Sequence, residues 1–555
     1  MATTVRNAKP LHELLLEHGA LKPEQLQQAR AEAAKTGEPL KRVLLRRGLM
    51  SEQELNALVA AQSGVTFIDL SNYLIKPEVI QLVPEALARK HTLIPVFKIG
   101  ESLTVAMDDP LNFFAVDALR LKTKCEIKTV VASETSIRQA IDQYYGASVT
   151  IAEVAQAIKE AALPKSDEEA AGEAPIIRLV NLLITQAVKE RASDIHIEPG
   201  DGTLRTRFRV DGLLEEVNGP PPHLHSAVVS RIKVLAKLDI AEKRKPQDGR
   251  FQVKMDGKDI DLRVSVVPGQ FGEKVVMRLL DSAGMRLSLQ ELGLDEHART
   301  QLERLIHVPH GILLVTGPTG SGKTTTLYAA LNLINDVSRN IITIEDPIEY
   351  HLPGIHQVQV NPKAEVTFAS ALRAFLRQDP NVIMVGEIRD RETAEIAIQA
   401  ALTGHLVLST LHTNDAASSL TRLIDMGVEP FLIASSVVGV LAQRLVRVIC
   451  PKCKEPYRPA TSVTDELQLK PDAQLFHGKG CPSCKQSGYK GRVGLFELLP
   501  MSEPIKNGVV SKAPAHAIRE TARKDGFRLL REDGLAKALA GVTTVEEVLR
   551  VTQLE

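Results

Sequence analysis

One segment limits the possible folds of this chain more than any other. An apolar run at 312–316 leads into Gly317-Pro-Thr-Gly-Ser-Gly-Lys-Thr324, and an Ala/Leu-rich helical stretch follows. This order predicts a phosphate-binding loop, because the glycines let backbone N–H groups surround phosphate oxygens at a helix N-terminus. A plain glycine-rich connector would leave the adjacent Lys323 and Thr324 unexplained. Further apolar runs at 341–344, 382–385 and 406–408 alternate with helical stretches, so the sequence predicts an α/β fold with a buried parallel sheet.

The residues of this loop have expected tasks. Lys323 supplies a charge at the β- and γ-phosphate oxygens, and the Thr324 hydroxyl can hold Mg²⁺. The predicted nucleotide-binding residues are Gly317, Thr319, Gly320, Ser321, Gly322, Lys323, Thr324 and Thr325.

Acidic residues follow two of the predicted strands. Hydrolysis needs a group that orients water and a carboxylate near the metal, in addition to phosphate binding. The run at 341–344 is followed by Glu345, Asp346 and Glu349, and the run at 382–385 is followed by Glu387. These positions lie at the carboxyl ends of parallel strands, where α/β folds bind ligands. The run before Glu387 is typical of a Walker B strand, with Glu where Asp is more usual.

Two histidines and three arginines are further candidates. His405 and His412 bracket the run at 406–408. A single histidine is more often structural, but two that bracket a strand beside a phosphate loop favour a functional role. The arginines could contact phosphate, although ion pairs with nearby acids explain them equally well; they are Arg373, Arg377 and Arg389.

Four of the five cysteines predict a metal site. Cys450-Pro-Lys-Cys453 and Cys481-Pro-Ser-Cys484 are CxxC pairs separated by 27 residues, more than the usual spacing of about 15–20. Four thiolates around Zn²⁺ leave no open position, so we expect a structural rather than a catalytic metal. A redox-active CxxC is the alternative, and the second matching pair argues against it. Cys125 is expected to be a lone packed thiol.

The chain is long enough for several domains. At about 100–200 residues each, 555 residues correspond to about three to five domains. Alternating strands with one polar face predict an α+β domain around 194–267. The predicted division is an N-terminal domain at 1–150, an acidic flexible linker at 151–175, a second domain at 176–285, and a third domain at 286–555 that includes the cysteine insertion at 447–497 and C-terminal helices at 500–555.

The N-terminal domain begins with an internal repeat. PLHELLLEHGALKPEQL from Pro10 and PLKRVLLRRGLMSEQEL from Pro39 align without gaps. Each unit predicts a helix, a glycine stop and a second helix within about 10–62. In the second unit Gly48 suits a helix end, and Ser51 with Glu54 suits a capping box. An α/β part is predicted at 66–145.

Charge and hydropathy exclude several classes of protein. Lys+Arg and Asp+Glu number 68 each, so no overall field attracts nucleic acid or an anionic membrane. Aromatic residues are 4% with no Trp, which disfavours stacking on single-stranded nucleic acid. No apolar run approaches the roughly 18–20 residues of a membrane helix, and the N-terminus lacks a signal-peptide core. We therefore expect a cytoplasmic chain without a transmembrane segment.

The motifs taken together carry a family resemblance. The chain contains GPTGSGKTTT, EDPIEY, RQDPNVIMVGEIRD and TGHLVLSTLHTND in this order, preceded by ASDIHIEP and KPQDGRF. This set resembles the secretion ATPase superfamily of type II secretion and type IV pilus assembly motors, and covers essentially the whole chain from about Pro175. The resemblance implies a PAS-like second domain, a RecA-like third domain and a homo-hexameric ring that hydrolyses ATP. The tetracysteine insertion resembles that of the assembly, or extension, branch rather than the retraction motors.

The resemblance also assigns roles by motif position. It implies that Glu349 is the general base toward water and that Glu387 acts on Mg²⁺ or its water. His405 and His412 would belong to a His box that senses phosphate.

Two arginines of the second domain match family positions credited with reaching the γ-phosphate. They are Arg263 in DLRVSVV and Arg278 in VVMRLL. Without the resemblance, each is more simply an exposed charge on a strand.

The N-terminal repeat resembles a module that docks on the inner-membrane assembly platform in some family members and binds cyclic di-GMP in others. Cyclic di-GMP binders carry Arg-Leu-Gly ahead of each unit, whereas this chain has Pro10-Leu11-His12 and Pro39-Leu40-Lys41. The missing arginine and glycine disfavour cyclic di-GMP binding. Docking on the platform is favoured, and a purely structural role is the alternative.

These observations predict a cytoplasmic hexameric motor ATPase, peripheral to the inner membrane, with ATP, Mg²⁺ and Zn²⁺ as cofactors. It would drive pilus or pseudopilus assembly in type II secretion or type IV pilus biogenesis. The alternative is a nucleic-acid translocating, conjugation-type ATPase on the same fold, which the zero net charge and sparse aromatics disfavour. A non-hydrolysing scaffold is disfavoured by the acids at the strand ends, and no residues indicate the acceptor pocket of a metabolite kinase.

Overall fold

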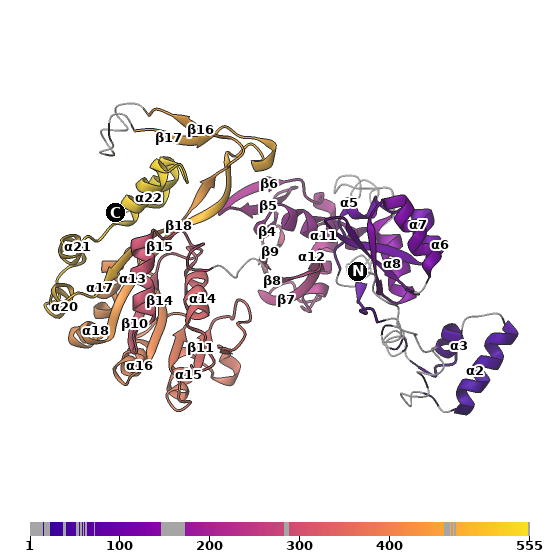
Figure 1. Cartoon of the computed structure of the whole chain (residues 1–555), viewed down its shortest axis with the longest axis horizontal. Helices are drawn as coiled ribbons and strands as arrows, with labels where there is room; N and C mark the ends of the chain where they lie inside the picture. Colours follow the sequence, from indigo (N-terminus) through magenta and orange to yellow (C-terminus); the bar gives the residue numbers. More distant parts are fainter. Residues whose placement is uncertain are drawn as a thin grey trace. The chain divides into compact units, whose positions relative to one another are not determined.

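A computed structural model describes most of the chain (Figure 1). The described residues are 23–36, 40–50, 64–70, 73–110, 112–145, 173–281, 288–459 and 473–552, with a few single positions between them. They divide into two compact units, Met1–Ala283 and Gly284–Glu555. Most of the first repeat unit from Pro10, the capping pair Ser51 and Glu54, and nearly all of the predicted linker lie outside the described residues.

The N-terminal part of the first unit combines helices with a small sheet. The helices α2 (Pro23–Thr36) and α3 (Leu40–Arg46) lie within the predicted repeat, and Gly48 follows α3 with φ of 63°, as expected for a helix stop. The sheet has the order β1-β2-β3, with β1 and β2 antiparallel and β2 and β3 parallel. Its elements are α5 (Pro77–Ile80), α6 (Glu85–His91), β1 (Leu93–Ile99), β2 (Ser102–Met107), α7 (Phe113–Thr123), β3 (Glu126–Val131) and α8 (Glu134–Tyr144).

A six-stranded antiparallel sheet follows in the same unit, in the order β6-β5-β4-β9-β8-β7. Along β8 the buried side chains Ile260, Leu262 and Val264 alternate with the more exposed Asp261 and Arg263, as the sequence predicts. The buried face packs against α11 and α12 in one apolar core. The elements are α11 (Ala174–Lys189), β4 (Ala192–Pro199), β5 (Leu204–Val210), β6 (Leu213–Val217), α12 (His225–Leu235), β7 (Gln247–Met255), β8 (Lys258–Gly269) and β9 (Gly272–Asp281).

The second unit is built on a seven-stranded sheet in the order β12-β11-β13-β14-β10-β15-β18. Neighbouring strands from β12 to β15 are parallel, and β18 pairs antiparallel with β15. The strands are β10 (Gly311–Thr316), β11 (Ile341–Glu345), β12 (His356–Gln359), β13 (Val382–Val385), β14 (Leu406–Leu411), β15 (Val437–Ile449) and β18 (Tyr489–Pro500). The four predicted strands are present, whereas β12, β15 and β18 are additions to the prediction.

Helices cover both faces of this sheet. Leu314 belongs to the core formed with α15, α16, α17 and α18, and its neighbour Leu313 belongs to the core formed with α13 and α14. The helices are α13 (Glu296–Ile306), α14 (Lys323–Ile334), α15 (Phe368–Phe375), α16 (Arg391–Leu402), α17 (Ala416–Asp425), α18 (Pro430–Ser436), α20 (Glu503–Val510), α21 (Ala515–Arg523), α22 (Leu530–Leu539) and α23 (Val545–Thr552). Two further strands, β16 (Lys454–Tyr457) and β17 (Leu475–Gly478), form a ribbon separate from the large sheet (Figure 1). In the described part of the chain, no helix combines the length and the apolar character that crossing a membrane requires.

A buried carboxylate fixes the C-terminal helix α23 to β15. Glu547 is 2% exposed and accepts hydrogen bonds from the Arg447 backbone N–H at 3.0 Å and from the Arg550 guanidinium at 2.8 Å. Burial alone would raise the pKa of Glu547, but the hydrogen bonds from Arg550 and Arg447 hold that pKa at about 2. The ionised carboxylate therefore stabilises the folded chain above its unfolded pKa of about 4.3.

We predict that Glu547→Gln destabilises the chain by about 1–3 kcal/mol near neutral pH, because two arginines lose their charged partner. The stabilising contribution of Glu547 is lost as the pH falls from about 5 toward about 2. The thermal midpoints of the wild type and of Glu547→Gln should therefore lie closer together at about pH 3.5 than at pH 7. A difference that does not change with pH would contradict this role for the carboxylate.

Candidate nucleotide site and metal centre

The phosphate-loop glycines are required by both conformation and space. Gly317, Gly320 and Gly322 have φ of 148°, 80° and 90°. Residues with a Cβ rarely adopt such positive φ values. A Cβ at Gly317 would lie 2.5 Å from the carbonyl oxygen of Gln443, and one at Gly322 would lie 2.7 Å from the Gln443 Nε2. The loop between β10 and α14 therefore closes tightly over β15.

Gln443 holds this loop in place. It is 2% exposed in β15, its Nε2 donates to the Ser321 carbonyl at 2.7 Å, and its Oε1 accepts from the Thr326 hydroxyl at 2.7 Å. Sequence reasoning missed this residue. The available signal was a lone amide within an apolar strand, which needs polar partners when buried.

The Lys323 ammonium group points back into the loop. Its Nζ donates to the carbonyl oxygens of Gly317 at 2.8 Å and Pro318 at 3.2 Å. Burial lowers the pKa of Lys323, the charge of Glu387 opposes this effect, and the charge of Arg444 adds to it. A phosphate in the loop offers Lys323 charged acceptors in place of two neutral carbonyls, so phosphate binding is favoured there.

An acid and a histidine meet at the carboxyl ends of β13 and β14. Glu387 follows β13, and its Oε2 accepts from His412 Nε2 at 3.1 Å. The Arg389 guanidinium forms an ion pair with the Glu387 carboxylate. Its hydrogen bond to this carboxylate raises the pKa of Arg389. Because β10 lies beside β14, the Glu387–His412 pair is at the same edge of the sheet as the loop with Lys323.

His405 lies at the opposite edge of the sheet. Its carbonyl accepts from the N–H of Gly311, which starts β10, whereas the phosphate loop follows the end of that strand. Five residue steps along a strand span about 17 Å. The His405 Nδ1 donates to the Ala400 carbonyl at 2.8 Å. Of the two predicted histidines, the structure thus brings only His412 to the phosphate-loop edge.

The three acids after the second predicted strand have different surroundings. Glu345 ends β11, is 3% exposed and turns inward to the Tyr328 hydroxyl. Asp346 is exposed, and one of its carboxylate oxygens lies 4.0 Å from Arg389. Glu349 is partly exposed on the following loop, and its backbone N–H donates to the Tyr328 hydroxyl at 3.3 Å. Glu349 is therefore the acid of this group that combines a fixed backbone with some access to solvent.

The three arginine candidates near β13 have contacts within the unit. Arg373 forms an ion pair with Glu392 of α16, and Arg389 forms one with Glu387. Arg377 donates to the carbonyl of Arg373 at 3.0 Å. Of the two roles that the sequence left open, phosphate contact or ion pairing, Arg373 and Arg389 show ion pairing in this structure.

The two predicted arginines of the first unit lie side by side on its six-stranded sheet. Arg263 in β8 is directly opposite Arg278 in β9 and Arg250 in β7. The Arg278 Nε donates to Asp194 at 2.9 Å, and the side chain of Arg278 is 56% exposed. These arginines lie on the polar face, opposite the apolar core under α11 and α12.

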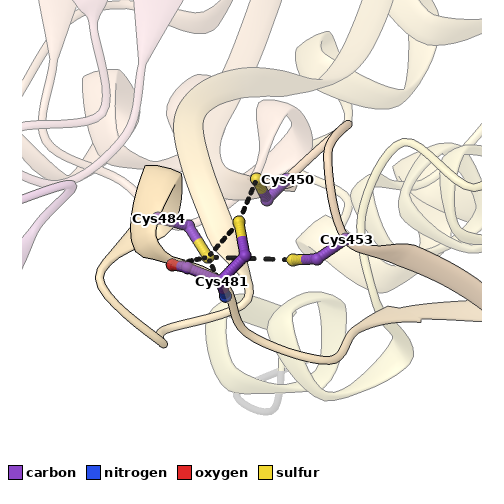
Figure 2. Close-up of side chains that lie close together, drawn as sticks. All are labelled: Cys450, Cys453, Cys481 and Cys484. Atoms are coloured by element: carbon purple, nitrogen blue, oxygen red, sulfur yellow. Dashed lines mark hydrogen bonds between the residues drawn. The ribbon is translucent and has the colours of Figure 1, made fainter.

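The four predicted cysteine ligands lie together (Figure 2). Cys450 and Cys453 follow β15, and Cys481 and Cys484 flank a short turn before β18. All four sulfurs lie within 4.8 Å of one another, and the closest pairs are 3.7 Å apart. A tetrahedron with Zn–S bonds of about 2.3 Å places its sulfurs about 3.8 Å apart. The four thiols are therefore compatible with zinc. Cys125 lies elsewhere and is buried, as predicted.

Comparison with known families and proteins identifies relatives of this chain. The family described as "Type II/IV secretion system protein" matches residues 169–550, and the MshEN domain family matches residues 63–151. The type IV pilus assembly ATPase PilB of Myxococcus xanthus (strain DK1622) is 46% identical over 97% of this chain and 98% of its own length. The type II secretion system protein E of Pseudomonas aeruginosa PAO1 is 53% identical over 76% of this chain and 84% of its own length.

A solved structure shares the fold. The ATPase DotB of Legionella pneumophila superposes with a TM-score of 0.51 at 22% identity, over 68% of this chain and 95% of its own. The family matches and this neighbour confirm the predicted α/β fold class. The family match and the two relatives confirm the predicted ATP hydrolase with a motor function. The chain belongs to the type II/IV secretion system protein family, a family of motor ATPases.

Proposed function

We propose that this chain is a hexameric motor that hydrolyses ATP at the loop around Lys323 to drive pilus or pseudopilus assembly, in type IV pilus biogenesis or type II secretion. The observation that carries the proposal is the presence of the phosphate loop and the Glu387–His412 pair at one edge of the sheet. The relatives named PilB and protein E, each at 46% identity or more, support the choice of system.

The nucleotide would be held by the loop residues named from the sequence. Backbone N–H groups of 317–325 would receive the phosphates, and Lys323 would neutralise the β and γ oxygens. The Thr324 hydroxyl and the Glu387 carboxylate, directly or through water, offer the hard oxygen donors that Mg²⁺ prefers. Bound Mg²⁺ would supply charge that stabilises the transferred phosphoryl group.

The attack on the γ-phosphate would be made by water. Glu349 would accept the proton of that water, and His412 would respond to the γ-phosphate through its hydrogen bond to Glu387. His405 remains a family-based prediction, because its place at the opposite edge excludes a direct contact with phosphate within the same chain. Arg263 and Arg278 would reach the γ-phosphate from the predicted second domain at 176–285. Their place side by side on a polar sheet face and the exposure of Arg278 support this role.

The remaining parts of the proposal concern assembly and location. The chain would work as a homo-hexamer on the cytoplasmic side of the inner membrane, with its N-terminal domain docked on the membrane platform. The MshEN domain match at 63–151 lies in this N-terminal domain. The missing Arg-Leu-Gly motifs disfavour cyclic di-GMP as its ligand. The domain boundaries near 150, 175 and 285 and a structural Zn²⁺ at the four cysteines belong to the same proposal.

The test is ATP binding and hydrolysis by the full-length chain. Lys323→Ala should weaken ATP binding by at least about tenfold, because it removes the charge that faces the phosphates. The matched control is Lys524→Ala, an exposed lysine in the same unit, which should bind ATP like the wild type.

Equal ATP affinity in Lys323→Ala and the wild type would contradict the proposed site. Hydrolysis that depends on added DNA, with a steep loss as salt increases, would support a nucleic-acid motor instead.

A further inference from the structure

A buried hydrogen-bonded cluster lies behind Glu349 and plays no part in the proposal above. Tyr328 belongs to α14, Glu345 ends β11, and Gln357 belongs to β12. The Tyr328 hydroxyl donates to Glu345 Oε2, and Gln357 Nε2 donates to Glu345 Oε1 at 3.1 Å. Three elements separated in the sequence therefore meet at one carboxylate.

The geometry of Glu345 is unsuited to binding a nucleotide or a metal. The residue is 3% exposed. In addition to the two donors already named, its Oε1 accepts from the Thr343 hydroxyl at 2.6 Å. Burial raises the pKa of Glu345 although all three donors favour its ionised form. Both carboxylate oxygens are thus engaged inside the protein.

The Tyr328 hydroxyl connects this carboxylate to the loop that carries Glu349. While it donates to Glu345, it accepts the backbone N–H of Glu349 at 3.3 Å. The Tyr328 ring also packs edge to face on the ring of Tyr350, with centroids 4.5 Å apart. The hydrogen bond that the Tyr328 hydroxyl donates to Glu345 therefore orients this hydroxyl, which in turn fixes the backbone at Glu349.

Gln357 fixes the same loop from its other end. Its Nε2 donates to the carbonyl of Tyr350 at 3.1 Å, and its Oε1 accepts the N–H of Leu352 at 2.8 Å. Since Tyr328 lies in the helix that starts at Lys323, the cluster joins the phosphate-binding helix to the backbone of the loop with Glu349.

We propose that Tyr328 and Glu345 are positioning residues that set the place of Glu349 relative to the phosphate loop. Tyr328 acts through its hydroxyl on the Glu349 backbone, and Glu345 acts by orienting that hydroxyl. This inference rests on the proposed role of Glu349 as the acceptor of the water proton. A small displacement of such a group reduces turnover without a matching loss of substrate binding.

The test is a double-mutant cycle in the full-length chain, measured by steady-state ATP hydrolysis over a range of ATP concentrations. Tyr328→Phe keeps the ring and removes the hydroxyl. It should lower kcat by about tenfold and change the KM for ATP by less than about threefold. Tyr489→Phe is the matched control, because it removes another phenol hydroxyl from the same unit, one that contacts Thr544 away from the nucleotide site. The control should keep wild-type turnover.

The cycle separates this inference from the proposal on which it rests. If Tyr328 acts through Glu349, Tyr328→Phe should cause no further loss in a Glu349→Gln background. A further tenfold loss in that background would overturn the positioning role. Wild-type turnover in Glu349→Gln alone would instead overturn the role of Glu349 itself.

Glu345→Gln provides a second variant if Tyr328→Phe folds poorly. The amide keeps an oxygen that can accept from the Tyr328 hydroxyl, so turnover should fall by less than about threefold in Glu345→Gln. In Glu345→Ala, which lacks this oxygen, turnover should fall by about tenfold. A loss in Glu345→Gln as large as that in Glu349→Gln would show that the carboxylate itself takes part in the reaction, and would overturn its assignment as a positioning residue.

Discussion

Glu349→Gln should bind ATP with nearly wild-type affinity and hydrolyse it about 10²–10⁴-fold more slowly. The amide keeps the shape of the side chain but cannot accept the proton of the attacking water, and general-base catalysis is worth a factor of this size. Glu387→Gln should have the same phenotype, because it removes the charge proposed to act on Mg²⁺ or its water. The measurements are phosphate release and the affinity for a fluorescent ATP analogue.

The matched control for both variants is Glu392→Gln. Glu392 is an exposed glutamate in the same unit that pairs with Arg373 rather than with the site acids. It should hydrolyse ATP at the wild-type rate. Near-normal turnover in both Glu349→Gln and Glu387→Gln would show that the reaction does not use these carboxylates.

The second large effect is expected at the cysteine cluster. The wild-type chain should contain one zinc ion, and Cys481→Ser should lose it, because the site has no thiolate to spare. Structural zinc contributes about 10–16 kcal/mol to folding in isolated zinc-finger peptides. Here β15 and β18 remain paired on the large sheet, so the loss should be confined to the segment that holds the four cysteines.

Two measurements check this expectation. Elemental analysis gives the zinc content, and limited proteolysis reports whether the segment at 450–488 opens. Cys125→Ser is the control, since this buried thiol lies in the other unit and should leave one zinc ion in place. One zinc ion per chain in Cys481→Ser, or none in the wild type, would contradict a four-cysteine site.

The parts of the site that the sequence predicted depend on local signals. The turn at Gly317–Gly322 and the residues Lys323 and Thr324 are adjacent in the chain, and they form one strand–loop–helix unit in the structure. Both CxxC pairs are equally local, and only their approach to each other needed the fold. The position of Glu387 followed from the rule that acids after parallel strands share one edge of the sheet.

The parts that could not be predicted depend on contacts between distant residues. Gln443 follows Ser321 by 122 residues, and no local pattern indicates their hydrogen bond. The buried runs of β15 and β18 lack the alternation that marks a half-exposed strand, which is why neither was expected. The position of His405 could have been predicted. A residue that precedes a parallel strand lies at the edge of the sheet opposite the carboxyl ends of the strands.

The most direct test of the proposed hydrolysis site is a structure of the full-length chain with Mg²⁺ and a non-hydrolysable ATP analogue. We expect the phosphates to lie in the loop at 317–325, with Lys323 on the γ-phosphate, Thr324 on Mg²⁺, and Glu349 and Glu387 within reach of the attacking water. A nucleotide bound elsewhere, or a γ-phosphate remote from both Glu349 and Glu387, would contradict the central claim that this edge of the sheet performs the hydrolysis.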